Sequence, residues 1–161
     1  MKRVIVIGCP GSGKSCFARA LQKKTGLPVS HLDLLYWNSD RTVVPREMFL
    51  ERLYAVMGQP CWIIDGNYAS TMEARLAACD TVFFLDYSTD ICLSGIRERR
   101  GKVREDLPWV EETEDEEFMT FVRGYRTEGR EHVLALQEKY PQKNWIVFSD
   151  RAEADRYLEG L

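Results

Sequence analysis

Eight residues near the N-terminus have the types and spacing of a phosphate-binding loop. The stretch Gly8-Cys-Pro-Gly-Ser-Gly-Lys-Ser15 matches the pattern G-x-x-x-x-G-K-[ST]. In this pattern the glycines let backbone N–H groups turn inward around phosphate oxygens, the lysine reaches the β- and γ-phosphates, and the serine hydroxyl binds Mg²⁺. The candidate nucleotide-binding residues are Gly8, Cys9, Pro10, Gly11, Ser12, Gly13, Lys14, Ser15 and Cys16.

The elements on either side of this loop are those that the motif requires. A short apolar run predicts a strand over Arg3–Ile7, and an amphipathic pattern predicts a helix over Lys14–Thr25. A helix that begins at Lys14 would add the partial positive charge of its N-terminus to the phosphate site. A glycine-rich turn without a ligand rarely combines the motif with both neighbours, so the sequence predicts a site for a nucleoside triphosphate.

Short β-branched runs alternate with helical patterns along the whole chain. This alternation indicates one α/β domain over residues 1–161, with a parallel sheet covered on both faces. We expect strands over Arg3–Ile7, Val29–Leu32, Trp62–Asp65, Thr81–Leu85 and Trp145–Phe148. We expect helices over Lys14–Thr25, Pro45–Met57, Ser70–Ala78, Thr89–Arg100, Glu116–Tyr140 and Ala152–Leu158.

The composition limits the class of protein. The chain has 161 residues, with 25 acidic and 22 basic side chains, a net charge of −3 and 45% hydrophobic residues. This balance predicts a globular protein and argues against nucleic acid as a partner, since such partners usually require a basic surface. No apolar run approaches the roughly 20 residues of a membrane span, and the five cysteines are scattered without a C-x-x-C pair. We therefore expect a cytoplasmic protein that does not enter membranes.

Several classes of nucleotide-binding protein lack support in the sequence. A GTPase would carry N-K-x-D, which is absent, and many motor-type ATPases carry Asp-Glu after an apolar strand, whereas Val82–Leu85 is followed by Asp86-Tyr87. The chain instead has an apolar strand that ends in Asp-Gly, within the segment Trp62–Tyr68.

The sequence resembles the adenylate-kinase-like small P-loop kinases, in particular the bacterial topology modulation (FlaR-like) proteins. The resemblance rests on Gly8–Ser15, His31–Asp33, Tyr36–Trp37, Trp62–Tyr68, Thr81–Asp86 and Arg97–Arg100, and spans nearly the whole chain. It implies a P-loop fold with a five-stranded parallel sheet in the order 2-3-1-4-5, with ATP as the nucleotide. It also implies a compact acceptor-binding subdomain over residues 33–61, closer to those of shikimate or gluconate kinases than to a nucleotide-clamping domain. Asp65 then stands where related kinases hold magnesium-bound water, so Ser15 and Asp65 are the candidate metal residues.

Asp33 is the candidate for activating a phosphoryl acceptor. It follows the second predicted strand, at the edge where open α/β sheets bind ligands, and a carboxylate there can orient a hydroxyl and accept its proton. The alternative is a helix N-cap or turn-stabilising role. Tyr36, Trp37 and Tyr68 could stack on an acceptor or pack as ordinary rim residues, and we expect His31 to be a packed strand residue.

An acidic segment separates two groups of arginines. Residues 101–117, which we call the lid, hold eight carboxylates against two basic residues. The resemblance implies that Arg97 and Arg100 act as lid arginines that neutralise the transferring phosphoryl group, with Arg97 also touching the nucleotide. Arg123 and Arg126 are weaker candidates for the same role. The alternative is that the segment is a solvated loop whose arginines make ordinary surface ion pairs.

Together these features predict a magnesium-dependent phosphotransferase that moves the γ-phosphoryl group of ATP to a small-molecule hydroxyl, nucleoside or nucleotide. Lys14, Asp33, Arg97 and Arg100 are the candidate catalytic residues. The competing hypothesis is an ATP-binding regulatory protein that affects DNA topology, with little or no kinase activity. We expect a monomer or a weak homodimer.

Overall fold

A computed structural model describes residues 1–161. Its centre is a five-stranded parallel sheet in the order β2-β3-β1-β4-β5, which confirms the predicted fold class and strand order. The strands are β1 (Arg3–Gly8), β2 (Val29–His31), β3 (Trp62–Asp65), β4 (Thr81–Leu85) and β5 (Asn144–Phe148). Each begins and ends within one residue of its prediction, because buried parallel strands are short and apolar throughout.

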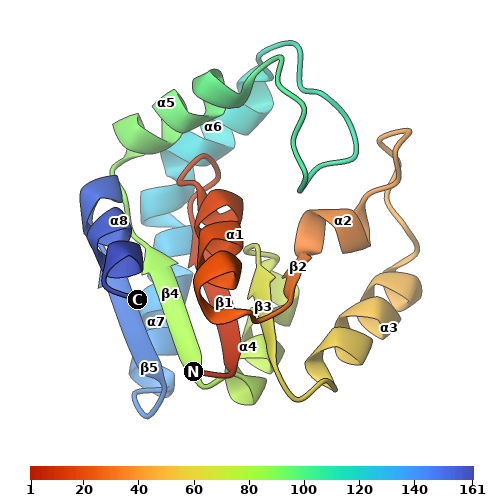
Figure 1. The fold of residues 1–161 in the computed structure, drawn as a ribbon. Helices are drawn as coiled ribbons and strands as arrows, with labels where there is room; N and C mark the ends of the chain where they lie inside the picture. The colour runs from red at the N-terminus through yellow and green to blue at the C-terminus, as the bar shows by residue number, and fades with distance from the viewer.

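Helices cover both faces of the sheet (Figure 1). They are α1 (Lys14–Thr25), α2 (Leu32–Tyr36), α3 (Arg46–Met57), α4 (Ala69–Ala78), α5 (Thr89–Arg99), α6 (Glu116–Gly124), α7 (Gly129–Lys139) and α8 (Arg151–Glu159), with a 3₁₀ turn, η1, at Tyr125–Thr127. Side chains of α1, α5, α6 and α8 form the core on one face, and those of α3, α4 and α7 form the core on the other. No helix is both long and apolar enough to span a membrane.

The central strand β1 contributes to both cores. Val4 and Val6 lie in one core and Ile5 and Ile7 in the other, since successive side chains of a strand point to opposite faces. All four are fully buried, and this continuous apolar run places the loop that follows it at the carboxyl edge of the sheet.

Two predicted elements differ in the structure. The single helix predicted over Glu116–Tyr140 is wrong: the chain forms α6, η1 and α7 instead. The break has a physical cause, because α6 packs on one face of the sheet and α7 on the other, so the chain must turn between them. The second strand also ends one residue early, and the chain turns at once into the short helix α2, which the sequence pattern did not predict.

The phosphate-binding loop is packed directly on α5. A Cβ atom added to Gly95 would lie 2.0 Å from the carbonyl oxygen of Gly11, and one added to Gly11 would lie 2.0 Å from the carbonyl oxygen of Cys92. Gly11 also has φ 84°, a conformation that other residues seldom adopt. Two glycines therefore allow the loop and the helix to approach backbone to backbone.

We expect Gly95→Ala to destabilise the fold by about 1–3 kcal/mol, because the methyl group would push the loop away from α5. Chemical denaturation measures this change. Gly124→Ala is the matched control, since nothing lies within 4 Å of its added Cβ. A denaturation midpoint of Gly95→Ala equal to that of the wild type would contradict the close approach.

Candidate functional site

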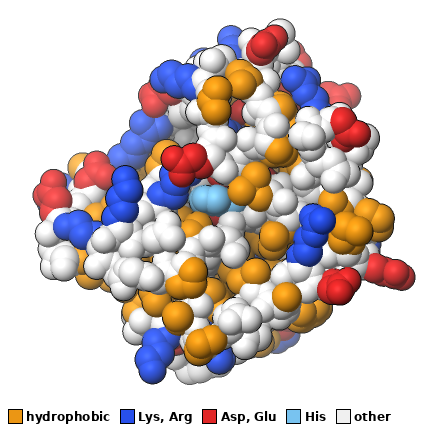
Figure 2. Space-filling model, turned by 45° about the vertical axis from the view of Figure 1, so that its right-hand side comes forward, with side chains coloured by type: hydrophobic (Ala, Val, Ile, Leu, Met, Phe, Trp, Pro, Cys, Tyr) orange, Lys and Arg blue, Asp and Glu red, His pale blue; other side chains and the backbone are white.

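The strand register brings the candidate residues together at the carboxyl edge of the sheet. Asp65 is paired with Val6 of β1 on one side and with His31 of β2 on the other. A cavity of about 960 Å³ opens at this edge, between the phosphate-binding loop, α2, α5, α8 and the lid. Figure 2 shows this side of the molecule, where acidic and basic side chains are interspersed around a histidine.

The phosphate-binding loop has the shape of an anion cradle. Residues 10–16 line the cavity, whereas Gly8 and Cys9 lie buried beneath it. Gly13 has φ 92° and nothing within 4 Å of the position of a Cβ atom, so the cradle is open on that side. The Ser12 hydroxyl is buried in the loop without a hydrogen-bond partner. An orphaned donor within a cradle of backbone N–H groups fits the oxygens of a bound phosphate.

Asn67 fixes the start of this loop. Its side-chain carbonyl accepts a hydrogen bond from Gly8 N at 3.1 Å, and its amide donates to Gly8 O at 2.7 Å. The loop from Gly66 to Tyr68 is held in turn by Arg75, a fully buried cation that donates to the carbonyl oxygens of Gly66, Asn67 and Tyr68. Arg75 thus holds the Gly66–Tyr68 loop, and Asn67 of that loop holds the start of the phosphate-binding loop. The sequence analysis assigned no role to Asn67 or Arg75.

Lys14, Ser15 and Asp65 lie next to one another as predicted. The Ser15 hydroxyl donates to Asp65 Oδ2 at 2.5 Å, and His31 Nδ1 lies 2.7 Å from Asp65 Oδ1. Lys14 Nζ donates to the carbonyl oxygen of Cys9 at 3.1 Å. Burial lowers the pKa of Lys14, while the charge of Asp65 acts in the opposite direction. His31 ends β2, as a packed strand residue would. Burial acts to lower its pKa, but the hydrogen bond and the charge of Asp65 outweigh this effect and raise it.

The oxygens of Ser15 and Asp65 fit a magnesium ion. A hydroxyl and a carboxylate adjoin at the phosphate site, and no group of three or more His, Cys, Asp or Glu side chains forms a complete metal cage. Mg²⁺ usually keeps several waters and is held by one or two protein oxygens together with substrate phosphates. The donor set at this site therefore matches the ion that the sequence predicted.

Asp33 faces the same cavity from the first turn of α2. Its carboxylate accepts a hydrogen bond from the Tyr68 hydroxyl at 2.5 Å and forms no ion pair. The N-cap position of α2 is occupied by His31, so Asp33 does not cap this helix. Burial raises the pKa of Asp33, and the hydrogen bond from Tyr68 and the charge of Lys14 partly offset that rise.

The structure places Arg97 and Arg100 away from the cavity. Both pair with Glu114 of the lid, at 3.6 and 3.1 Å. The arginine of α5 that lines the cavity is Arg99, which lies one helical turn after Gly95 and therefore on the face turned to the phosphate-binding loop. The four-residue spacing between Gly95 and Arg99 is visible in the sequence. It identifies Arg99 as a cavity residue only once the contact between Gly95 and the phosphate-binding loop is known.

Arg123 and Arg126 do not line the cavity either. Arg123 lies 3.7 Å from Glu116, and Arg126 donates to the carbonyl oxygen of Tyr87 at 3.2 Å. Two other arginines, Arg19 on α1 and Arg104 in the lid, do line it, and the sequence analysis did not single them out.

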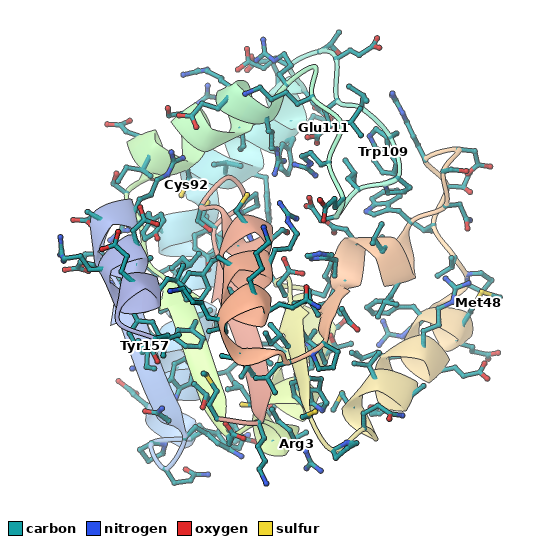
Figure 3. The ribbon with its side chains drawn as sticks, viewed as in Figure 1. Arg3, Met48, Cys92, Trp109, Glu111 and Tyr157 are labelled. Atoms are coloured by element: carbon teal, nitrogen blue, oxygen red, sulfur yellow. The ribbon has the colours of Figure 1, made fainter.

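Aromatic side chains form one wall of the cavity. Trp37 and Tyr68 line it, while Tyr36 packs behind them against both rings. Trp109 of the lid meets Trp37 edge to face, with ring centroids 5.3 Å apart, and Arg41 lies over the ring of Trp109. Figure 3 shows Trp109 on the part of the lid that faces α2. The lid therefore contacts the segment predicted to bind the acceptor.

The residues that line the cavity fall into two groups by their predicted roles. We call donor half the group around the predicted nucleotide site, which is the phosphate-binding loop together with Gly95, Glu98, Arg151 and Asp155. We call acceptor half the group around the predicted acceptor residue Asp33, which also holds His31, Trp37, Tyr68 and the lid residues Arg104, Glu105 and Asp106. Arg151 is the first residue of α8, and it pairs with Glu98 at 3.3 Å.

No protein-family model matches the chain, and no curated protein matches it. Among solved structures it is similar to the shikimate kinase from Bacteroides thetaiotaomicron, with 17% sequence identity, a TM-score of 0.65 and coverage of 99% of this chain and 95% of that chain. It is also similar to an unliganded sugar kinase from Janibacter sp. HTCC2649, with 17% identity, a TM-score of 0.55 and coverage of 99% and 91%. The chain therefore has the fold of the small P-loop kinases. Its predicted place in the topology modulation group stays a prediction.

Proposed function

We propose that the protein is a magnesium-dependent kinase that transfers the γ-phosphoryl group of ATP to a hydroxyl group of a small molecule. The observation that carries this proposal is the position of Asp33, which faces the same cavity as Lys14, Ser15 and Asp65. The names of the two structural neighbours, a shikimate kinase and a sugar kinase, support a small hydroxylated acceptor.

On the donor side, the chain's own groups bind and neutralise the triphosphate. The backbone N–H groups of the loop hold the phosphate oxygens, and Lys14 lies where it can reach the transferring group. Ser15 and Asp65 would hold Mg²⁺, which would supply positive charge to offset that of the phosphate groups. Arg99 of α5 lines the cavity, so it would take the neutralising role that the resemblance assigned to Arg97 and Arg100.

On the acceptor side, Asp33 orients the hydroxyl and takes its proton. The hydroxyl oxygen forms a bond to the γ-phosphorus, the bond from that phosphorus to the bridging oxygen breaks, and ADP leaves with the electron pair. The hydroxyl proton passes to the Asp33 carboxylate and from there to water. A carboxyl whose pKa is raised by burial is a better proton acceptor than an exposed one.

The lid closes the cavity above these groups. Its contact with Trp37 through Trp109 joins the acceptor segment to the end of α5, and such a cover limits access of water to the transferring group. The hypothesis of a regulatory ATP-binding protein that affects DNA topology stays a prediction. A kinase assay with ATP and a panel of sugars, polyols, nucleosides, nucleotides and shikimate tests the proposed function.

We expect Lys14→Met to lower ATP turnover at least about 100-fold, because the variant loses the loop cation that would neutralise the transferring group. The release of ADP measures turnover. Lys24→Met on the exposed side of the same helix is the control and should behave as the wild type. Undiminished turnover in a folded Lys14→Met protein would contradict the proposed function.

We expect Arg99→Ala to lower kcat about 100-fold, while Arg97→Ala changes it little, because only Arg99 lines the cavity. Steady-state kinetics at saturating ATP compare the two variants. A loss in Arg97→Ala with Arg99→Ala unaffected would restore the assignment made from the sequence.

The pH dependence of kcat/KM should report the ionisation of Asp33. Its carboxylate must be charged to accept a proton, so activity falls as the pH drops through its raised pKa. Tyr68→Phe removes a hydrogen bond that favours the charged form, and the acid limb of the profile should therefore move to higher pH. Tyr36→Phe, which removes a neighbouring hydroxyl, should leave this limb in place. An unmoved limb in Tyr68→Phe would argue against Asp33 as the proton acceptor.

A further inference from the structure

The lid inserts one carboxylate into the cavity. Asp106 and its neighbour Leu107 are both buried, whereas Val103 and Glu105 just before them are exposed. Figure 1 shows that the segment between α5 and α6 reaches down toward α2 at the carboxyl edge of the sheet. Asp106 lines the cavity, so the buried part of the lid carries a negative charge into the site.

Asp106 lies among groups that suit an anion. Its carboxylate is 3.6 Å from the guanidinium group of Arg19 and 3.5 Å from that of Arg104. Burial acts to raise the pKa of Asp106, but the charge of Arg104 and a hydrogen bond with the Ser15 hydroxyl outweigh that effect and lower it, so the carboxylate is charged. Ser15 and Arg19 are four residues apart and share one face of α1. One hydroxyl and two guanidinium groups therefore surround this carboxylate.

The ion pairs of Asp106 do not use the full hydrogen-bonding capacity of the two arginines. Charge-assisted hydrogen bonds from arginine to an anion are about 2.7–2.9 Å long, and both ion pairs of Asp106 are longer than that. Arg19 Nη1 and Arg104 Nε are also buried without a hydrogen-bond partner, which is unfavourable for a donor. The two arginines can therefore bind another anion more tightly than they bind this carboxylate.

A phosphoryl group is the anion that fits this position. It presents three strong acceptor oxygens and a larger charge than a carboxylate, and guanidinium groups bind it through parallel pairs of hydrogen bonds. Ser15 belongs to the phosphate-binding loop, so the terminal phosphoryl group of a triphosphate on that loop would lie close to Asp106. Two anions at one place repel each other, so the carboxylate must leave when the phosphoryl group enters.

The surroundings of Asp106 do not favour a metal-binding role for this residue. Both of its charged neighbours at ion-pair distance are cations, and they would repel a metal ion beside the carboxylate. No group of three or more His, Cys, Asp or Glu side chains could hold a metal ion, although Asp65 and His31 are near. The carboxylate is therefore placed as an anion among cations.

We propose that Asp106 occupies the place of a phosphoryl group in the ligand-free protein and holds the lid shut until the triphosphate displaces it. This contact adds autoinhibition to the proposed function, on which the inference rests. When the triphosphate binds, its terminal oxygens take over Arg19 and Arg104, and Asp106 withdraws from them. Part of the binding free energy then offsets the loss of the Asp106 contacts, so the affinity for the nucleotide is lower than the site could give.

The first test compares affinities for a nucleotide in the full-length protein. Mg²⁺ and a non-hydrolysable ATP analogue are titrated by calorimetry. We expect Asp106→Asn, which keeps the shape of the side chain and removes its charge, to bind the analogue about tenfold more tightly than the wild type. Glu112→Gln is the matched control, because it removes the same charge from an exposed lid residue without an ion pair, and it should behave as the wild type.

The sign of the change decides between the roles of Asp106. Unchanged affinity in Asp106→Asn would overturn the inference, because the carboxylate would then not compete with the triphosphate. Weaker binding would overturn it too, because Asp106 would then support the nucleotide or its metal ion. If the analogue binds neither to the wild type nor to Asp106→Asn, the proposed function fails and the inference fails with it, and the same titration shows this separately.

Digestion with trypsin tests the closed lid in the wild type itself. The lid has cleavage sites after Lys102 and Arg104, and cleavage requires the local chain to leave its folded position. We expect the bond after Arg104 to resist trypsin in the ligand-free wild type and to be cut about tenfold faster in Asp106→Asn, because the open lid is then more populated. Rapid cutting after Arg104 in the ligand-free wild type, with the rest of the protein intact, would overturn the inference.

Discussion

The buried carboxylate of Asp65 links the parts of the site to the sheet. It ends β3, between β1 and β2, and its two oxygens contact Ser15 at 2.5 Å and His31 at 2.7 Å. A carboxylate that is 3% exposed is costly without such partners, so these contacts are obligatory for this fold. They fix α1, which begins at the phosphate-binding loop, relative to α2, which begins just after His31 and carries Asp33. The phosphate-binding loop and Asp33 are thereby held at fixed positions relative to each other.

The second constraint is charge balance around the cavity. The chain has a small excess of acidic residues, and many of them lie in the lid. Glu111 faces Arg99 and Arg104, Glu114 faces Arg97, and Asp106 faces Arg104. The acidic segment therefore provides counter-charges for arginines that would otherwise repel one another.

Much of the fold could be predicted from the sequence because its strongest signals are local. Five apolar runs gave the strands to within a residue, and α1 has the predicted bounds, with Gly26 ending it in a left-handed conformation. The helix predicted over Glu116–Tyr140 failed because its two halves pack on opposite faces of the sheet. Helix α2 was missed because five residues carry too little periodic pattern to be recognised.

The sequence by itself determined the phosphate-binding motif, since the loop's glycines, Lys14 and Ser15 are adjacent in the chain and form the loop from neighbouring backbone. Only the tertiary structure decided which distant side chains share that site. It turned Arg99 rather than Arg97 or Arg100 toward the cavity, because the contact between Gly11 and Gly95 sets the rotation of α5. It also placed Asp33 against Tyr68 and paired the lid with the arginines, since these contacts join segments whose separation along the chain carries no information about their distance in space.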